Sequence, residues 1–130
     1  MESATNGYAQ AAIRDLVPVG GHGGVIRLLP VSGVHFLQAR GDYVRVVADS
    51  GRFLIRGQIA HFEERWAPFG FVRVHRGYLV NLRRVVELRP HPNGTGSAVL
   101  ADGGEVPVSR RKRIELRRML RTMEAAKPSV

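Results

Sequence analysis

Arginine is the residue type in this sequence whose number and side-chain chemistry point most directly to a function. The 130-residue chain has twenty Lys and Arg residues against eleven Asp and Glu residues, and all but Lys112 and Lys127 of the twenty are Arg. A guanidinium group can bind a phosphate, or the edge of a guanine base, through two parallel hydrogen bonds. The net charge of +9 therefore favours a polyanion, or an anionic membrane surface, as the partner. A coding bias of the genome towards Arg explains the ratio of Arg to Lys equally well.

Most of the excess charge lies near the C-terminus, where residues 110–130 carry a net charge of +6. The pattern there predicts a helix from Ser109 to Ala126, with Ser109 as the N-cap. Its apolar residues fall on one face, namely Leu116, Met119, Leu120 and Met123. Five arginines fall on the opposite face, namely Arg110, Arg111, Arg117, Arg118 and Arg121. We expect the apolar face to pack on the domain. The arginine face is either a binding surface or an ordinary solvated one, although solvated faces usually mix charges of both signs.

Residues that could catalyse a reaction or bind a metal lack the arrangements that these functions need. The sequence contains no Cys, which excludes disulfides, thiolate metal sites and a cysteine nucleophile. No metal-ligand spacing links His22, His35, His61 and His91. No acid–base pair is evident among Asp42, Glu63, Glu64 and Glu87, and no Ser lies in a nucleophile elbow. We therefore predict a protein that is not an enzyme and needs no metal or cofactor.

Short apolar runs separated by turn residues predict a mainly β domain that begins at residue 25. The expected strands cover 25–29, 34–40, 43–48, 52–55, 71–75, 78–81, 85–89, 97–100 and 105–108. The spacing of Phe62 and Trp66 predicts a short helix over about 58–66, which these two side chains anchor on the sheet.

The first 24 residues are predicted to form a flexible linker. Pro18 and the glycine-rich run at 20–24 interrupt regular structure, although a short amphipathic helix over 8–17 is compatible with the pattern. No apolar run approaches the roughly 20 residues that span a bilayer, and no secretory signal is evident. We therefore expect a cytoplasmic protein without a membrane partner.

Three segments resemble motifs of the LytTR DNA-binding domain family of bacterial transcription regulators. The central segment is Phe71–Asn81, in which a basic residue follows the histidine and Tyr-Leu-Val-Asn follows a small residue. Val106–Arg111 resembles the strand that leads into the family's final helix, and Val34–Val44 resembles its first hairpin. The resemblance covers about residues 25–124.

The resemblance implies both a fold and a function. The fold would be mainly β, with short antiparallel sheets in an elongated arrangement, one short internal helix and a C-terminal helix. The domain would occupy 25–126, between the linker over 1–24 and a tail over 127–130. Members bind double-stranded DNA through loops that enter neighbouring major grooves, commonly at promoter direct repeats. Many are output domains of response regulators in two-component systems, with a receiver domain ahead of them, and a homodimer on DNA is expected from the repeated sites.

The family's contact positions transfer to six residues. Arg76, which follows the histidine, would bind a guanine edge. Arg110, which opens the final helix, would act at a helix N-terminus, where backbone N–H groups also favour phosphate. The hairpin tip at Asp42 and Tyr43 would be the third contact region, unless Tyr43 packs inward as a strand residue. Arg111 and Arg113 are expected to touch phosphates.

Other interpretations stay open at this point. The chain could be a non-specific or RNA-binding small basic β domain, although its few aromatic residues make a poor stacking platform. It could be a stand-alone regulator or the excised output domain of a longer one. His75 is expected to be a structural hydrogen-bonding residue rather than a ligand or a base. Asn81 is expected to be a satisfied, turn-forming amide that holds the shape of a loop, rather than a residue that reads a DNA base. Lys112 and Arg113 fall near the packing face of the final helix, so its first turn could dock loosely or lean on DNA.

Overall fold

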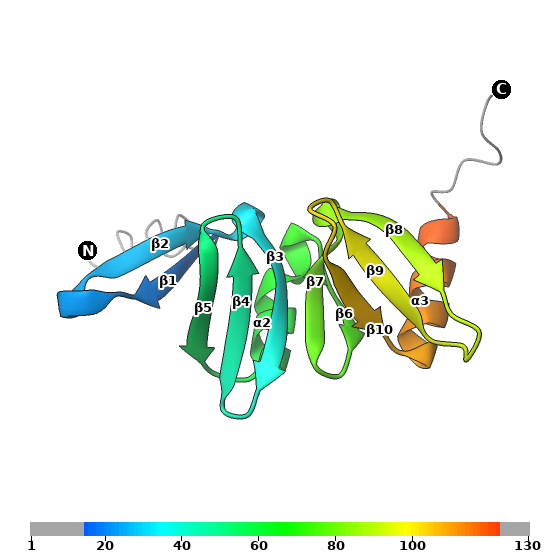
Figure 1. The fold of residues 1–130 in the computed structure, drawn as a ribbon, viewed down its shortest axis with the longest axis horizontal. Helices are drawn as coiled ribbons and strands as arrows, with labels where there is room; N and C mark the ends of the chain where they lie inside the picture. Colours follow the sequence, from blue (N-terminus) through cyan, green and yellow to red (C-terminus); the bar gives the residue numbers. More distant parts are fainter. Residues whose placement is uncertain (1–14, 123–130) are drawn as a thin grey trace, which may run out of the picture.

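The computed structural model describes residues 15–122, which form ten short strands, two α-helices and four short 3-10 helices (Figure 1). The strands are β1 (Leu16–Gly20), β2 (Ile26–Pro30), β3 (Val34–Arg40), β4 (Tyr43–Ala48), β5 (Gly51–Arg56), β6 (Phe71–His75), β7 (Tyr78–Asn81), β8 (Val85–Pro90), β9 (Gly96–Leu100) and β10 (Glu105–Val108). The helices are α2 (Ile59–Trp66) and α3 (Arg110–Arg121), and the 3-10 helices are η1 (His22–Gly24), η2 (Val31–Gly33), η3 (Ala67–Phe69) and η4 (Leu82–Arg84).

Three antiparallel sheets follow one another along the long axis of the molecule (Figure 1). β1 and β2 form a two-stranded sheet at one end, and β10-β9-β8 form a three-stranded sheet at the other. The central sheet has five strands in the order β5-β4-β3-β7-β6. The predicted mainly β, elongated architecture with one internal and one C-terminal helix is thereby confirmed.

The prediction of a linker over 1–24 is wrong for Leu16–Gly20, which form strand β1. This strand pairs with β2 from Leu16 opposite Pro30 to Gly20 opposite Ile26, and Val17 and Val19 are only 2% and 3% exposed. Pro18 fits because a two-stranded sheet has only edge strands, in which a missing N–H can face solvent. Residues 1–14 of the predicted linker lie outside the described residues.

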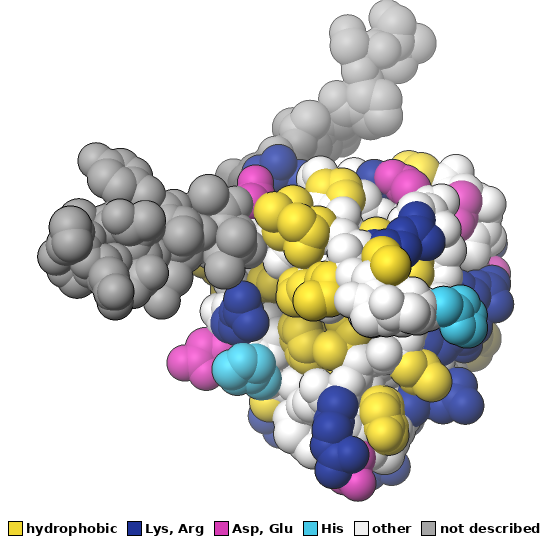
Figure 2. Space-filling model, turned by 90° about the vertical axis from the view of Figure 1, so that its left-hand side faces the viewer, with side chains coloured by type: hydrophobic (Ala, Val, Ile, Leu, Met, Phe, Trp, Pro, Cys, Tyr) yellow, Lys and Arg dark blue, Asp and Glu magenta, His cyan; other side chains and the backbone are white. Residues whose placement is uncertain are grey.

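The outer face of this hairpin is apolar. Val25, Ile26 and Leu28 are each more than half exposed. Figure 2 looks onto this end of the molecule and shows hydrophobic side chains gathered on its surface. The buried side chains of β1 point the other way, toward the core of the central sheet.

Two hydrophobic cores lie on opposite faces of the central sheet. The first is formed by the hairpin, the central strands and α2, whose Phe62 and Trp66 are buried as predicted. The second lies between β6–β7, the three-stranded sheet and α3, where Leu116 is buried. β6 and β7 contribute to both cores, because successive strand residues point to opposite faces.

Helix α3 docks through a narrower face than its apolar pattern predicted. Leu116 is buried and Leu120 is half-buried, but Met119 is 46% exposed. The stems of Lys112 and Arg113 are half-buried instead, so the first helical turn does pack on the domain. Residues 123–130, including Met123, the predicted last helical turn and the tail, lie outside the described residues.

Candidate nucleic-acid interface

The turn between β3 and β4 exposes Asp42 and Tyr43. Gly41 has a φ of +61°, which a glycine adopts without steric cost. The Asp42 carbonyl accepts a hydrogen bond of 2.9 Å from the Gly57 amide, which fixes the turn to the end of β5. Tyr43 is 43% exposed and lies under the Arg56 guanidinium, whose Cζ is 5.8 Å from the ring centroid. Tyr43 therefore does not pack inward.

The turn between β6 and β7 carries Arg76, whose side chain is exposed. Its backbone is held by Arg73, which donates from Nε to the His75 carbonyl at 3.0 Å and from Nη2 to the Arg76 carbonyl. The third donor of Arg73, Nη1, binds Glu63 Oε1 at 2.9 Å. His75 Nδ1 accepts a hydrogen bond of 3.0 Å from the Gly77 amide, so the predicted structural hydrogen bonding of His75 is confirmed.

The start of α3 carries Arg110, Arg111 and Arg113. Ser109 is the N-cap, and its side chain accepts a 3.3 Å hydrogen bond from the Lys112 amide. Arg111 extends into solvent, and its Nε lies 3.7 Å from Glu115 Oε1.

The other two of these arginines bind the loop between β8 and β9. Arg110 Nη2 donates to the Asn93 carbonyl at 2.6 Å, and Arg113 Nη1 donates to the Thr95 carbonyl at 3.3 Å. The loop is itself ordered by Asn93 Oδ1, which accepts from the Thr95 amide at 3.1 Å. Arg110 remains exposed and Arg113 is half-buried.

All three regions lie along one long edge of the molecule, which is the lower edge in Figure 1. β3 and β6 are both antiparallel to β7 and therefore run in the same direction, so the turns that follow them emerge at the same edge. The Ser109 amide binds the Val74 carbonyl at 2.9 Å, which ties the start of α3 to the end of β6. The fold thus brings together the six residues predicted for the site, although they span about 70 positions of sequence.

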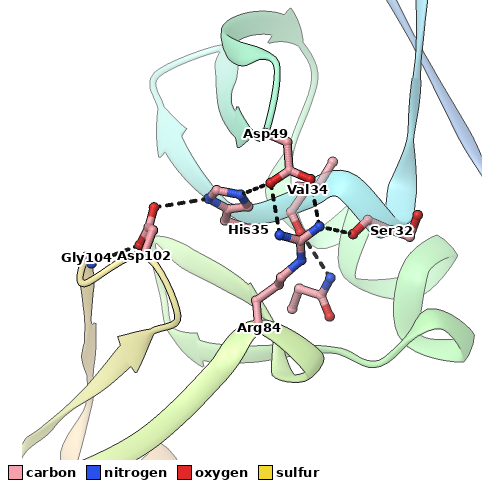
Figure 3. Close-up of polar contacts among 8 residues, drawn as sticks. Ser32, Val34, His35, Asp49, Arg84, Asp102 and Gly104 are labelled. Carbon is pink, nitrogen blue, oxygen red and sulfur yellow. Dashed lines mark hydrogen bonds and ion pairs between the residues drawn. The ribbon is translucent and has the colours of Figure 1, made fainter.

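The opposite edge holds a cluster of mixed charge, shown in Figure 3. His35 Nε2 lies 2.6 Å from Asp49 Oδ1, and its Nδ1 lies 3.5 Å from Asp102 Oδ2. Arg84 binds both oxygens of Asp49 and donates to the Ser32 carbonyl at 2.8 Å. Hydrogen bonds from Arg84, and then from His35, lower the pKa of the Asp49 carboxyl from 3.8 to about 2.

Asn81 is 2% exposed and makes two hydrogen bonds, which tie the end of β7 to the start of β3 and cap η4. Its Nδ2 donates to the Val34 carbonyl at 3.0 Å, and its Oδ1 accepts from the Arg83 amide at 3.0 Å. The prediction of a satisfied, loop-shaping amide is confirmed.

Sequence reasoning missed the residues that hold the predicted contacts in place. Arg73 and Glu63 lie on β6 and α2, and no local pattern in the sequence relates them to the Arg76 turn. The hydrogen bond from Arg110 to the Asn93 carbonyl, 17 positions away, depends on the fold and has no local signal in the sequence. Within residues 15–122, no group of three His, Asp or Glu side chains is placed to hold a metal ion. In the same part of the chain, no helix has the length and apolarity to cross a membrane.

The chain is similar to known bacterial regulatory proteins over most of its length. The model of the LytTr DNA-binding domain family matches residues 24–121. The sensory transduction protein LytT of Bacillus subtilis is 26% identical over 95 residues, which are 73% of this chain and 39% of that protein. An uncharacterized response regulatory protein of Vibrio cholerae is 34% identical over 106 residues, or 82% of this chain and 43% of that protein. The transcriptional regulatory protein BtsR of Escherichia coli is 35% identical over 95 residues, or 73% of this chain and 38% of that protein.

Among solved structures, the fold is similar to the LytTr DNA-binding domain of a putative methyl-accepting/DNA response regulator from Bacillus cereus. The TM-score is 0.73 at 24% sequence identity, and the match covers 82% of this chain and 96% of that one. The chain spans less than half the length of the three relatives described above. These comparisons give no support to a non-specific or RNA-binding domain.

Proposed function

The chain belongs to the LytTr DNA-binding domain family, and from this premise we propose that it binds duplex DNA sequence-specifically. It does so as a transcription regulator or as the output domain of a longer response regulator. The observation that carries the proposal is the common edge. Three exposed regions lie along it, two of them turns of the central sheet and the third the start of α3, and two of the three present arginines. A row of separate projections along one edge suits successive major grooves of a duplex, into which each region can insert.

Each region has a distinct role in the proposed complex. Arg76 and Arg110 bind guanine edges, because a guanidinium can donate to O6 and N7 together. Asp42 and Tyr43 contact the bases beside the first hairpin. Arg111 and Arg113 bind phosphates, which position the domain without selecting a sequence.

The same proposal covers the longer protein that contains the domain and the arrangement of its copies on DNA. Because the relatives are more than twice as long as the matched region, we infer that a receiver domain accompanies this unit in a longer parent chain. Two copies bind a pair of direct repeats in a promoter, as a homodimer on DNA. The protein acts in the cytoplasm, needs no cofactor and catalyses no reaction.

The decisive experiment is a selection of bound duplexes from a random pool. A sequence-specific domain enriches a short motif, and the spacing of repeated motifs shows how two copies are arranged. The selected duplex is then compared with a scrambled duplex and with single-stranded DNA and RNA over a range of salt concentrations. Every polyanion gives an affinity that falls with salt, but only the proposed function retains a preference for the selected duplex at high salt. Failure to enrich any motif would refute the proposal.

A further inference from the structure

The central sheet has a second surface. Of the six residues predicted to contact DNA, only Tyr43 lies on it. α2 and the β1–β2 hairpin cover the face that carries Leu37, Val44 and Val46. α2 lies behind the sheet in Figure 1, so the other face of β3, β4 and β5 is turned toward the viewer. Residues that alternate with the buried ones along these strands must point to this open face.

Four arginines lie on the open face, namely Arg40, Arg45, Arg52 and Arg56. The strand register sets Tyr43 opposite both Arg40 and Arg56, which makes a row of three side chains across β3, β4 and β5. This row lies at the same edge as the β3–β4 turn. Arg45 and Arg52 follow on the neighbouring rows, farther from the edge.

Contacts on this face hold two of the guanidinium groups in place. Arg56 stacks over Tyr43, as described above. Arg45 Nη1 donates to Gln38 Oε1 at 3.4 Å, and Gln38 Nε2 donates to the Tyr78 hydroxyl at 2.9 Å. Arg40, Arg45 and Arg52 also contribute to the lining of one shallow hollow of about 300 Å³. Three of the four cations therefore line one region of the sheet, and the fourth, Arg56, lies in the same row as Arg40.

Their charge is not neutralised within the described part of the chain. None of the ion pairs found among residues 15–122 involves the four arginines of the open face. Their basic members are His35, Arg73, Arg84, Arg89, Arg111 and Lys112. None of the four is directly opposite another, but Arg45 lies diagonal to the other three, at a separation that long side chains can span, so their charges repel one another. A ligand that supplies several anionic groups at once would relieve this repulsion, and a phosphate backbone is such a ligand.

We propose that the open face of β3, β4 and β5 binds the phosphate backbone of duplex DNA through Arg40, Arg45, Arg52 and Arg56. This inference rests on the proposed function and adds a contact surface to it. β5 is the edge strand farthest from β6, against which α3 packs. The four arginines therefore bind phosphates outside the base pairs contacted by the β3–β4 turn, on the side away from α3. Phosphate contacts raise the affinity for every sequence alike.

The test uses the double variant Arg40→Gln/Arg56→Gln. The matched control is Arg65→Gln/Arg83→Gln, which removes the same charge from exposed side chains outside the open face. Each phosphate contact contributes about 0.9 to the slope of log affinity against log salt, so the test variant loses about 1.8 of this slope. The selected and the scrambled duplex lose affinity by the same factor. The control keeps the wild-type slope, and Arg40→Lys/Arg56→Lys also keeps it, because an ammonium group still binds phosphate.

A second measurement locates the contact. Base pairs are removed from one flank of the selected duplex and then from the other. Trimming one flank alone should bring the wild-type slope down to that of the test variant. An unchanged slope in the test variant, or an equal loss in the control, would overturn the inference while leaving the proposed function intact. Loss of all sequence preference in the wild type would instead refute the proposed function, and the slopes on a single duplex would still decide the role of the open face.

Discussion

Arg84 and Asp49 are joined by two parallel hydrogen bonds, of 2.9 Å from Nη1 to Oδ1 and 2.8 Å from Nη2 to Oδ2. Arg84 ends the short helix between β7 and β8, whereas Asp49 lies in the β4–β5 turn. The pair therefore connects the segment that enters the three-stranded sheet with the far side of the central sheet. It lies at the edge opposite the predicted DNA contacts, where a change of charge can be made without touching them.

The first prediction concerns acid stability. The pKa of Asp49 is about 2 in the folded protein, against the usual 3.8, so the folded state binds fewer protons than the unfolded state between these values. The pair's contribution is complete above about pH 4, and it is lost as the pH falls through about 2. Asp49→Asn should lower stability near pH 6 by about 1 kcal/mol or less, because the pair is partly exposed. Urea unfolding at several pH values should show a smaller difference from wild type at pH 2 than at pH 6. The same difference in stability at pH 2 and at pH 6 would contradict this prediction.

The second prediction concerns base recognition by Arg76. Arg76→Ala should reduce discrimination at one base pair of the selected duplex by about 1–3 kcal/mol. The unfolding temperature should not change, because Arg73 and His75 hold the turn through backbone atoms and His75 Nδ1. Competition with duplexes that carry single base-pair changes measures the effect. If binding to all duplexes were weakened equally, Arg76 would contact the phosphate backbone of the DNA instead of a base.

The third prediction concerns Arg73, which supports the Arg76 turn from behind. Arg73→Gln removes hydrogen bonds to two carbonyls of the turn and to Glu63. We expect a loss of about 1–3 kcal/mol in stability, together with weaker discrimination at the base pair that Arg76 contacts. A double-mutant cycle with Arg76→Ala should be non-additive in discrimination. Additive effects would show that Arg73 acts only on global stability.

The fourth prediction concerns Gly94, beside Arg110. Its φ is +93°, and a Cβ atom there would lie 2.8 Å from Arg110 Nε. Gly94→Ala should therefore strain the loop by about 1–3 kcal/mol and also displace Arg110, which lowers DNA affinity. Gly103→Ala is the matched control, because Gly103 has a φ of +92° with no atom within 4 Å of the added Cβ. Both variants should lose stability, but only Gly94→Ala should bind DNA more weakly. If the two variants bound DNA with equal affinity, Gly94 would have no role in positioning Arg110.

Much of the fold follows from local signals in the sequence. The Asp102-Gly103-Gly104 turn predicts the β9–β10 hairpin, and Ser109 marks the start of α3 because its side chain can accept an amide N–H. Phe62 and Trp66 identify the buried side of α2 by their spacing. Strand β1 escaped prediction because Pro18 and its neighbouring glycines suggest a break, whereas pairing with β2 and burial of two valines stabilise a strand.

The candidate site, like the fold, could be predicted from the sequence only in part. Its exposed residues lie in motifs that can be located along the chain, but their shared edge depends on strand direction in the central sheet. The open face of β3, β4 and β5 could not be foreseen, because Arg40 and Arg56 are 16 positions apart and meet only through the register of both strands with Tyr43.

The sharing of β6 and β7 between the two cores has a consequence for cooperativity. Phe71 and Leu79 pack into one core, and Val74 and Val80 pack into the other. Neither core can open without exposing a face of the strands that the other core needs, so the two melt as one unit. The amides of β7, which pairs with β3 on one side and with β6 on the other, should exchange with solvent only on global unfolding. Arg76 thus lies in a turn between two strands that both cores share, and its position should persist until the whole domain unfolds.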